Sequence, residues 1–318
     1  MKILIFCAHP DDLEFIIPSF ILTTSQFVPE FLNNKEKIKL KELNKEALKY
    51  IFKNPNIDLL DLKIKIASMT RGEMSFFTDE IKSTLKAAKI RENELIKSQK
   101  VLSGKIPDFL GFFDGFIRAS DFAIEKIKNY INALKPDIVI APEPLFAWYH
   151  HPDHVRTGKI VFYAIRRLAK LKNVTIPKLF YFQSLLNDFY FPRFSFHKKI
   201  IKKALKFHRS QQKVLLPARI PGFFENLFHG LKIPYHIFGE ALRYQPIFPK
   251  YKEENEKIHN NQKIRKIKIH KNILNLNLFK RMIYYCTFKI FNSFTLNDYN
   301  KRYKYFDGKL NEKINLTW

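Results

Sequence analysis

Runs of apolar residues at regular intervals along the chain predict a parallel β-sheet. The segments KILIFCA (2–8), LKIKIASM (62–69) and PDIVIAPE (136–143) are rich in hydrophobic residues, as expected of strands that are covered on both faces. The segments at 106–113 and 178–184 continue the series. Because helical patterns separate these strands, we predict βαβ units and an α/β fold, with a mostly parallel sheet flanked by helices.

The predicted helices cover residues 12–24, 27–56, 78–102, 119–134, 153–171 and 196–215. Pro18 lies inside the first helical pattern and should kink or shorten that helix, because proline lacks the backbone N–H. Residues 27–56 are highly charged. We interpret them as a helical excursion, that is, an insertion that interrupts the alternation of strands and helices. Beyond about residue 250 the composition changes: residues 251–318 hold 15 Lys plus Arg against 6 Asp plus Glu, interleaved with aromatics. We therefore predict a domain over 1–250 and a basic, aromatic-rich extension over 251–318.

The amino-acid composition of the chain limits the kinds of protein that it can be. With 318 residues and 46% hydrophobic content, the chain can form a large core. Its two cysteines, Cys7 and Cys286, are too few for a disulfide framework or a zinc ribbon, so a bound metal would use histidine and carboxylate ligands. We attribute most of the net charge of +26 to a lysine-rich bias. Because no nucleic-acid-binding motif is present, we do not expect nucleic acid as a partner, whereas contact with an anionic membrane stays open.

Localisation is predicted from the first eight residues and from the hydropathy of the chain. These residues lack the length and the cleavage site of a secretory signal, and no stretch reaches about 18 uninterrupted apolar residues. We expect a cytoplasmic protein that does not span a membrane and that touches one peripherally at most.

Two polar motifs follow predicted strands. CAHPDD (7–12) follows the first strand, and WYHHPDHVRTG (148–158) follows the strand at 136–143. Since the carboxyl ends of parallel strands share one edge of the sheet, the two motifs should meet there. His9, Asp12 and His154 would then supply the three protein ligands typical of catalytic zinc and leave one position for water.

Each motif alone also fits a simpler interpretation. Asp11 or Asp12 could cap a helix, while Pro152 and Asp153 could begin another. Two such motifs at two strand ends are harder to explain as caps, so we favour a metal site.

The motif residues that are not proposed as metal ligands indicate which reaction the site could catalyse. Asp11 adjoins a ligand and could take a proton from the attacking water. His151 lies one helical turn before His154, where it could stabilise an oxyanion or protonate a leaving amine. Asp153 could orient His151. Together these groups are suited to metal-assisted hydrolysis.

With both motifs, the chain resembles the PIG-L/LmbE-like family of zinc-dependent N-acetylglucosamine deacetylases. The resemblance rests on AHPDD (8–12), on the following Glu14, and on HPDH (151–154). Weaker matches are TRGE (70–73), RENEL (91–95), FFDG (112–115), KPDIVIAPE (135–143) and FHRSQ (207–211).

This resemblance implies a Rossmann-like fold, and it implies the same metal ligands and catalytic residues as above. It also implies that Arg91 and Asp114 contact the sugar and that Tyr149 faces the substrate. The chain departs from the family in one place: where the family has a glycine-rich stretch after the first motif, this chain has Ile16, Pro18 and Ser19.

We therefore expect an enzyme that uses zinc, or another divalent metal, to remove acetate from a GlcNAc-containing small molecule or glycolipid. One alternative is a hydrolase of the same architecture that acts on another N-acyl or amide group. Another is a basic membrane- or nucleic-acid-binding protein with a structural metal site. Asp11 and His151 argue against this last class, because a structural site needs only its ligands. The sequence does not specify an oligomeric state.

Overall fold

The computed structural model describes residues 1–52, 62–74, 83–145, 147, 151–184, 189–191, 196–211, 240–245 and 247. The chain divides into two units, Met1–Trp148 with Pro152–Asn255, and Tyr149–His151 with Glu256–Trp318. Every described residue except His151 belongs to the first unit, whose fold follows. Both the extension predicted at 251–318 and Tyr149 lie outside the described residues.

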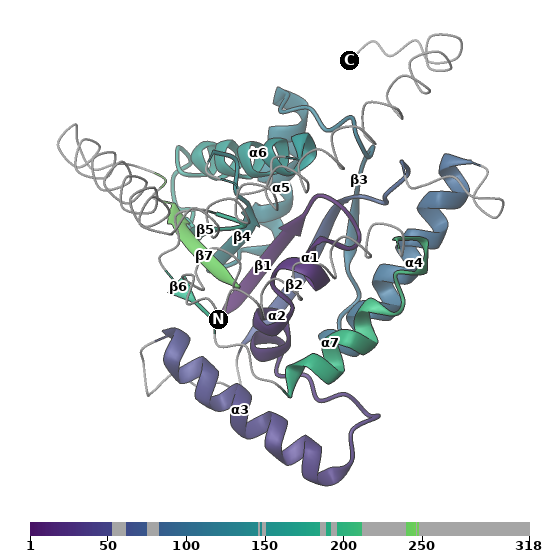
Figure 1. Cartoon of the computed structure of the whole chain (residues 1–318). Helices are drawn as coiled ribbons and strands as arrows, with labels where there is room; N and C mark the ends of the chain where they lie inside the picture. Colours follow the sequence, from purple (N-terminus) through teal and green to yellow (C-terminus); the bar gives the residue numbers. More distant parts are fainter. Residues whose placement is uncertain are drawn as a thin grey trace, which may run out of the picture. The chain divides into compact units, whose positions relative to one another are not determined.

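A seven-stranded sheet forms the centre of this unit, with the strand order β3-β2-β1-β4-β5-β7-β6 (Figure 1). The first five strands in this order are parallel to one another, β7 is antiparallel to β5, and β6 is antiparallel to β7. The predicted α/β fold with a mostly parallel sheet is confirmed, and so are all five predicted strands. The strands are β1 (Lys2–Cys7), β2 (Lys63–Thr70), β3 (Asp108–Phe112), β4 (Ile138–Pro142), β5 (Lys178–Phe182), β6 (Phe189–Tyr190) and β7 (Ala241–Gln245).

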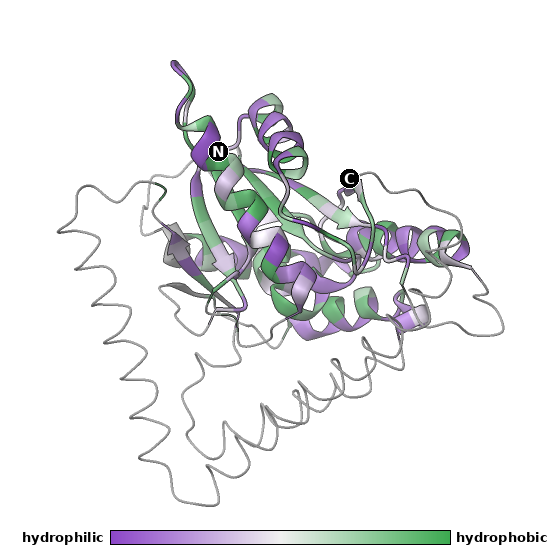
Figure 2. Cartoon of the chain, turned by 90° about the horizontal axis from the view of Figure 1, so that it is seen from above, coloured by the Kyte–Doolittle hydropathy of each residue, from purple (hydrophilic) through white to green (hydrophobic). Residues whose placement is uncertain are grey.

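Helices cover both faces of the sheet. Along β1, Leu4 and Phe6 pack into one core cluster while Ile3 and Ile5 pack into the other, so both faces of this strand are buried. The first cluster joins the sheet to α5 (Asp121–Leu134) and α6 (Pro152–Leu168). The second joins it to α1 (Asp12–Ile16), α2 (Pro18–Ser25), α3 (Asn34–Phe52), α4 (Thr84–Leu102) and α7 (His197–Leu205). Figure 2 shows mainly hydrophobic strands between helices that carry hydrophilic residues.

The helix after the first motif is broken at the predicted position. α1 ends at Ile16 and α2 begins at Pro18, so the expected effect of this proline is confirmed. The backbone N–H groups of Ser19 and Phe20 donate to the buried carboxylate of Glu240, over 3.0 and 2.8 Å. A proline and a distant carboxylate thus organise the segment that follows the first motif.

The remaining predicted helices are also present within the described residues. Part of the excursion at 27–56 forms α3, and a short 3-10 helix, η2 (Arg209–Gln211), follows α7. No helix in the described ranges is both long enough and apolar enough to cross a bilayer.

Candidate metal centre

Three donor atoms from the two motifs converge at the carboxyl edge of the sheet. Nδ1 of His9 lies 3.2 Å from Nε2 of His154, which lies 3.1 Å from Oδ1 of Asp12. The third side of this triangle, from His9 Nδ1 to Asp12 Oδ1, measures 3.6 Å. Ligands about 2.0–2.1 Å from a tetrahedral zinc ion lie about 3.3 Å from one another. The donor set therefore fits a tetrahedral divalent ion and leaves a fourth position open.

Backbone and side-chain hydrogen bonds orient these ligands. Oδ2 of Asp12 accepts the backbone N–H groups of Ala8 and His9, both at 2.9 Å, which turns Oδ1 towards the histidines. Nδ1 of His154 lies 2.9 Å from Oε1 of Gln183. Because an amide oxygen only accepts, Nδ1 carries the proton and the lone pair of Nε2 faces the site. Gln183 was not predicted from the sequence, because it lies just after β5 and belongs to neither motif.

The second ring nitrogen of His9 faces two carboxylates. Its Nε2 lies 3.1 Å from Oδ1 of Asp114 and 3.4 Å from Oδ2 of Asp153. A histidine that ligates a metal usually donates its other N–H to such a group, which fixes the orientation of the ring.

His9, Asp114 and Asp153 could also hold an ion by themselves. We favour the set with Asp12 and His154, because the backbone N–H groups donate to Oδ2 of Asp12 and leave Oδ1 facing both histidines, whereas Oδ2 of Asp153, the oxygen that faces His9, itself accepts a backbone N–H. Met74 donates to Asp114 over 3.2 Å, and Gly115 donates to Asp153 over 2.6 Å. The carboxylates are therefore suited to accept the Nε2–H of His9 as well.

Charges in the cluster depend strongly on one another. Burial alone would lower the pKa of His9, but Asp114 and Asp12 outweigh burial and raise this pKa well above its usual value. Burial would raise the pKa of Asp12, but His154 and His9 lower it well below the usual range. A divalent cation would replace the proton that balances these carboxylates, so metal binding should release protons.

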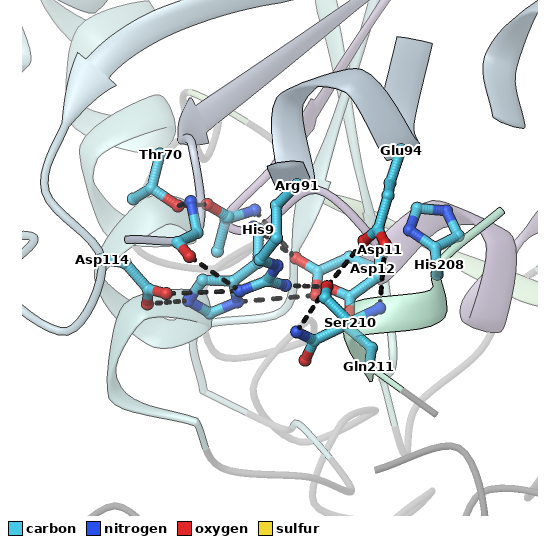
Figure 3. Close-up of polar contacts among 12 residues, drawn as sticks. His9, Asp11, Asp12, Thr70, Arg91, Glu94, Asp114, His208, Ser210 and Gln211 are labelled. Atoms are coloured by element: carbon cyan, nitrogen blue, oxygen red, sulfur yellow. Dashed lines mark hydrogen bonds and ion pairs between the residues drawn. The ribbon is translucent and has the colours of Figure 1, made fainter. Parts of the chain in front are cut away.

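The expected base, Asp11, lies at the N-terminus of α1 and contacts Arg91 of α4 (Figure 3). Nη2 of Arg91 donates to Oδ1 of Asp11 over 2.7 Å, and Nη1 lies 3.4 Å from Oδ2 of Asp114. Burial would lower the pKa of Arg91, but Asp11 and Asp114 raise it. The two residues expected at the sugar, Arg91 and Asp114, are therefore in contact with each other, and Arg91 is in contact with the base.

The other predicted site residues are placed as follows. Asp153 is fully buried in the first turn of α6, where Oδ2 contacts Gly115 and His9. From the sequence, Asp153 was proposed to orient His151. His151 is half-buried immediately before α6 and belongs to the second unit.

A second polar cluster lies beside Asp11 (Figure 3). Glu94 accepts the backbone N–H and the hydroxyl of Ser210, at 2.8 and 2.6 Å. Glu14 accepts Ser98 and Gln99, and its Oε1 lies 3.6 Å from Nε2 of His208. The fold thus unites two of the weaker sequence matches, RENEL and FHRSQ.

Comparisons with known proteins indicate the family and the fold of this chain. Residues 60–165 match the model of a family described as PIG-L, GlcNAc-PI de-N-acetylase. This range includes HPDH but begins after the first motif, which the fold places beside HPDH. A search of curated proteins finds no match.

Two solved structures share the fold. N,N'-diacetylchitobiose deacetylase from Pyrococcus horikoshii, in complex with its inhibitor MPG, is 22% identical, with a TM-score of 0.56 over 77% of this chain and 84% of that one. The conserved protein TT1542 from Thermus thermophilus is 19% identical, with a TM-score of 0.51 over 77% of this chain and 95% of that one.

Proposed function

This chain belongs to the PIG-L family, and on that premise we propose that it is a metal-dependent N-deacetylase that removes acetate from a GlcNAc-containing substrate. The observation that supports this proposal best is the triangle of donor atoms from His9, Asp12 and His154, with sides of 3.1–3.6 Å. A carboxylate outside this ligand set, Asp11, lies next to Asp12 in the chain. A metal site with an open position and a neighbouring base is suited to hydrolysis rather than to a structural role.

We assign the role of holding the ion to His9, Asp12 and His154, and we favour zinc because two imidazoles and one carboxylate suit it. Such an ion, when bound, polarises the acyl carbonyl and lowers the pKa of water. Asp11 takes the proton of the attacking water. His151 stabilises the oxyanion or protonates the leaving amine, supported by Asp153. Water and the N-acetyl group thereby become acetate and a free amine.

The substrate also needs contacts away from the reacting carbonyl. For the sugar we propose Tyr149 and Asp114, as the family resemblance implies. Oδ1 of Asp114 already contacts His9 at 3.1 Å. A hydrogen bond from a sugar hydroxyl to Asp114 would therefore use the lone pairs of the carboxylate that remain.

The direct test is acetate release by the zinc-loaded protein from free, oligomeric and lipid-linked GlcNAc. We expect acetate and free amine in equal amounts from at least one of the three, and loss of the reaction after chelation. Release of the acyl group only from other N-acylated sugars would favour the alternative hydrolase. No hydrolysis of any substrate by folded, metal-loaded protein would favour a binding protein with a structural site.

We further propose that the protein is cytoplasmic and contacts an anionic membrane peripherally. α7 supports this idea: Ile200 and Ala204 face the core, while Lys198, Lys199, Lys202 and Lys203 carry its positive charge. α7 contains no acidic residue. The lysines of this helix are attracted electrostatically to anionic lipid headgroups. The extension at 251–318, with its lysines and aromatics, would add to the attraction.

The variant that replaces Lys198, Lys202 and Lys206 by Gln tests this contact. Because each lysine near the surface contributes about 1 kcal/mol, we expect binding to phosphatidylserine-containing vesicles to weaken by about 10²-fold, with turnover of a short soluble substrate unchanged. The matched control replaces three exposed lysines in and just after α6, Lys159, Lys170 and Lys172. Equal loss in both variants, or binding that does not respond to salt, would contradict a role for α7.

A further inference from the structure

The guanidinium of Arg91 is enclosed by groups of the protein itself. Nη2 donates to Asp11 over 2.7 Å, while Nη1 is 3.4 Å from both Asp114 and the carbonyl oxygen of Gly72. Only 5% of Arg91 is exposed. We propose that Arg91 is a positioning residue that holds the carboxylate of Asp11 for its role as base, rather than a contact for the sugar. This inference rests on the proposed function.

The loop after β2 forms one wall around Arg91. Gly72 has a φ of +76°, and a Cβ there would lie 2.4–2.5 Å from the guanidinium. Only glycine therefore permits this packing without displacing the arginine. The loop is itself fixed to the first motif, because the hydroxyl of Thr70 donates to the carbonyl of Ala8 over 2.8 Å and accepts the N–H of Gly72 over 3.3 Å.

Asp114 forms another wall, and its position is also fixed. Its backbone N–H donates to Glu73 over 3.2 Å, and its Oδ2 accepts the N–H of Met74 over 3.2 Å. Its Oδ1 contacts Nε2 of His9 at 3.1 Å. Arg91 thus connects the proposed base to the carboxylate that orients a proposed metal ligand, as Figure 3 shows.

The two carboxylate oxygens of Asp11 differ in their contacts. Oδ1 accepts a hydrogen bond from Arg91, whereas Oδ2 has no hydrogen-bond partner within the described part of the chain. One carboxylate oxygen is therefore anchored and the other is available to accept a proton. Catalysis depends on such orientation, and a displacement of about 1 Å can cost about 10²-fold in rate.

A double-mutant cycle of Arg91→Met and Asp11→Asn tests the proposal. For Arg91→Met we expect kcat to fall by about 10- to 10²-fold, with KM within about threefold of the wild type and the metal content unchanged. If Arg91 acts through Asp11, the same change should cost less than about threefold when Asp11 is already Asn. If Arg91 contacted the sugar, Arg91→Met would instead raise KM by about tenfold or more. Its effect on the rate would then multiply with that of Asp11→Asn in the double variant. Either result would overturn the proposal.

Arg71→Met is the matched control, since the side chain of this neighbouring arginine is about half exposed and pairs with Glu92 at 3.5 Å. It should change neither constant by more than about twofold. If Arg91→Met does not fold, Gly72→Ala keeps the arginine but displaces it, and the same fall in kcat is expected.

A crystal structure of Arg91→Met supplies a test that needs no activity. We expect the carboxylate of Asp11 to rotate away from its wild-type orientation. An unchanged orientation would overturn the positioning role. Absence of acetate release by the wild type would count against the proposed function alone.

Discussion

His154→Ala is expected to lose the metal and the activity together. The variant leaves only His9 and Asp12 as protein ligands, and two ligands do not hold a divalent ion against dialysis. We expect the zinc content to fall from about one ion per chain to less than about a tenth, and acetate release to fall by more than about 10³-fold. Elemental analysis after dialysis and an assay of acetate release measure the two effects on one sample.

His197→Ala is a suitable control for the removal of a buried histidine. His197 is also fully buried, at the start of α7, and burial lowers its pKa to about 4. We assign it no part in the site, so this variant should keep its metal even if it is less stable. Full metal content in His154→Ala would show that the ligand set is wrong. The cluster of His9, Asp114 and Asp153 would then be the remaining candidate.

The fold and the ligand triangle could be predicted because both follow from local patterns. Continuous apolar segments showed which strands are covered on both faces, and parallel strands bring their carboxyl ends to one edge. That rule alone placed the AHPDD motif next to HPDH, although Asp12 and His154 are 142 residues apart. The break at Pro18 was predictable for a similar reason, because it follows from the covalent structure of one residue.

The surroundings of the ligands could not be predicted in this way. Gln183 orients His154, and Glu240 caps α2. Neither residue belongs to a motif, and each acts on an element far from it in sequence. β7 was missed because a five-residue strand that pairs antiparallel at the edge of a parallel sheet leaves no alternation with helices to recognise. Such partners are selected by tertiary packing and not by a local pattern.

Arg91 illustrates the same limit for function. The resemblance to the family implies that Arg91 contacts the sugar, because in relatives an arginine stands at this position of the motif. The direction of its guanidinium depends on Gly72, which allows close approach, and on Asp114, which lies after another strand. The sequence indicated which residues gather at the site, but only the fold shows which of them contact one another.

Asp11→Asn separates the proposed base from the proposed ligands. The amide has the same shape as the carboxylate, and its oxygen can still accept the N–H of Arg91, so the local packing should persist. The three donor atoms of the ligand set are untouched, and the metal content should therefore equal that of the wild type. Turnover should nevertheless fall by about 10²- to 10⁴-fold, which is the usual contribution of a positioned general base.

The same two measurements, metal content and acetate release, decide between the possible roles of Asp11. If Asp11→Asn loses the metal as readily as His154→Ala does, Asp11 is itself a ligand and the triangle is incomplete. If the variant keeps both its metal and full turnover, another group accepts the proton of the attacking water. A variant that keeps the metal but loses the rate would match the arrangement in the structure, where Asp12 faces His9 and His154 while Asp11 is held by Arg91.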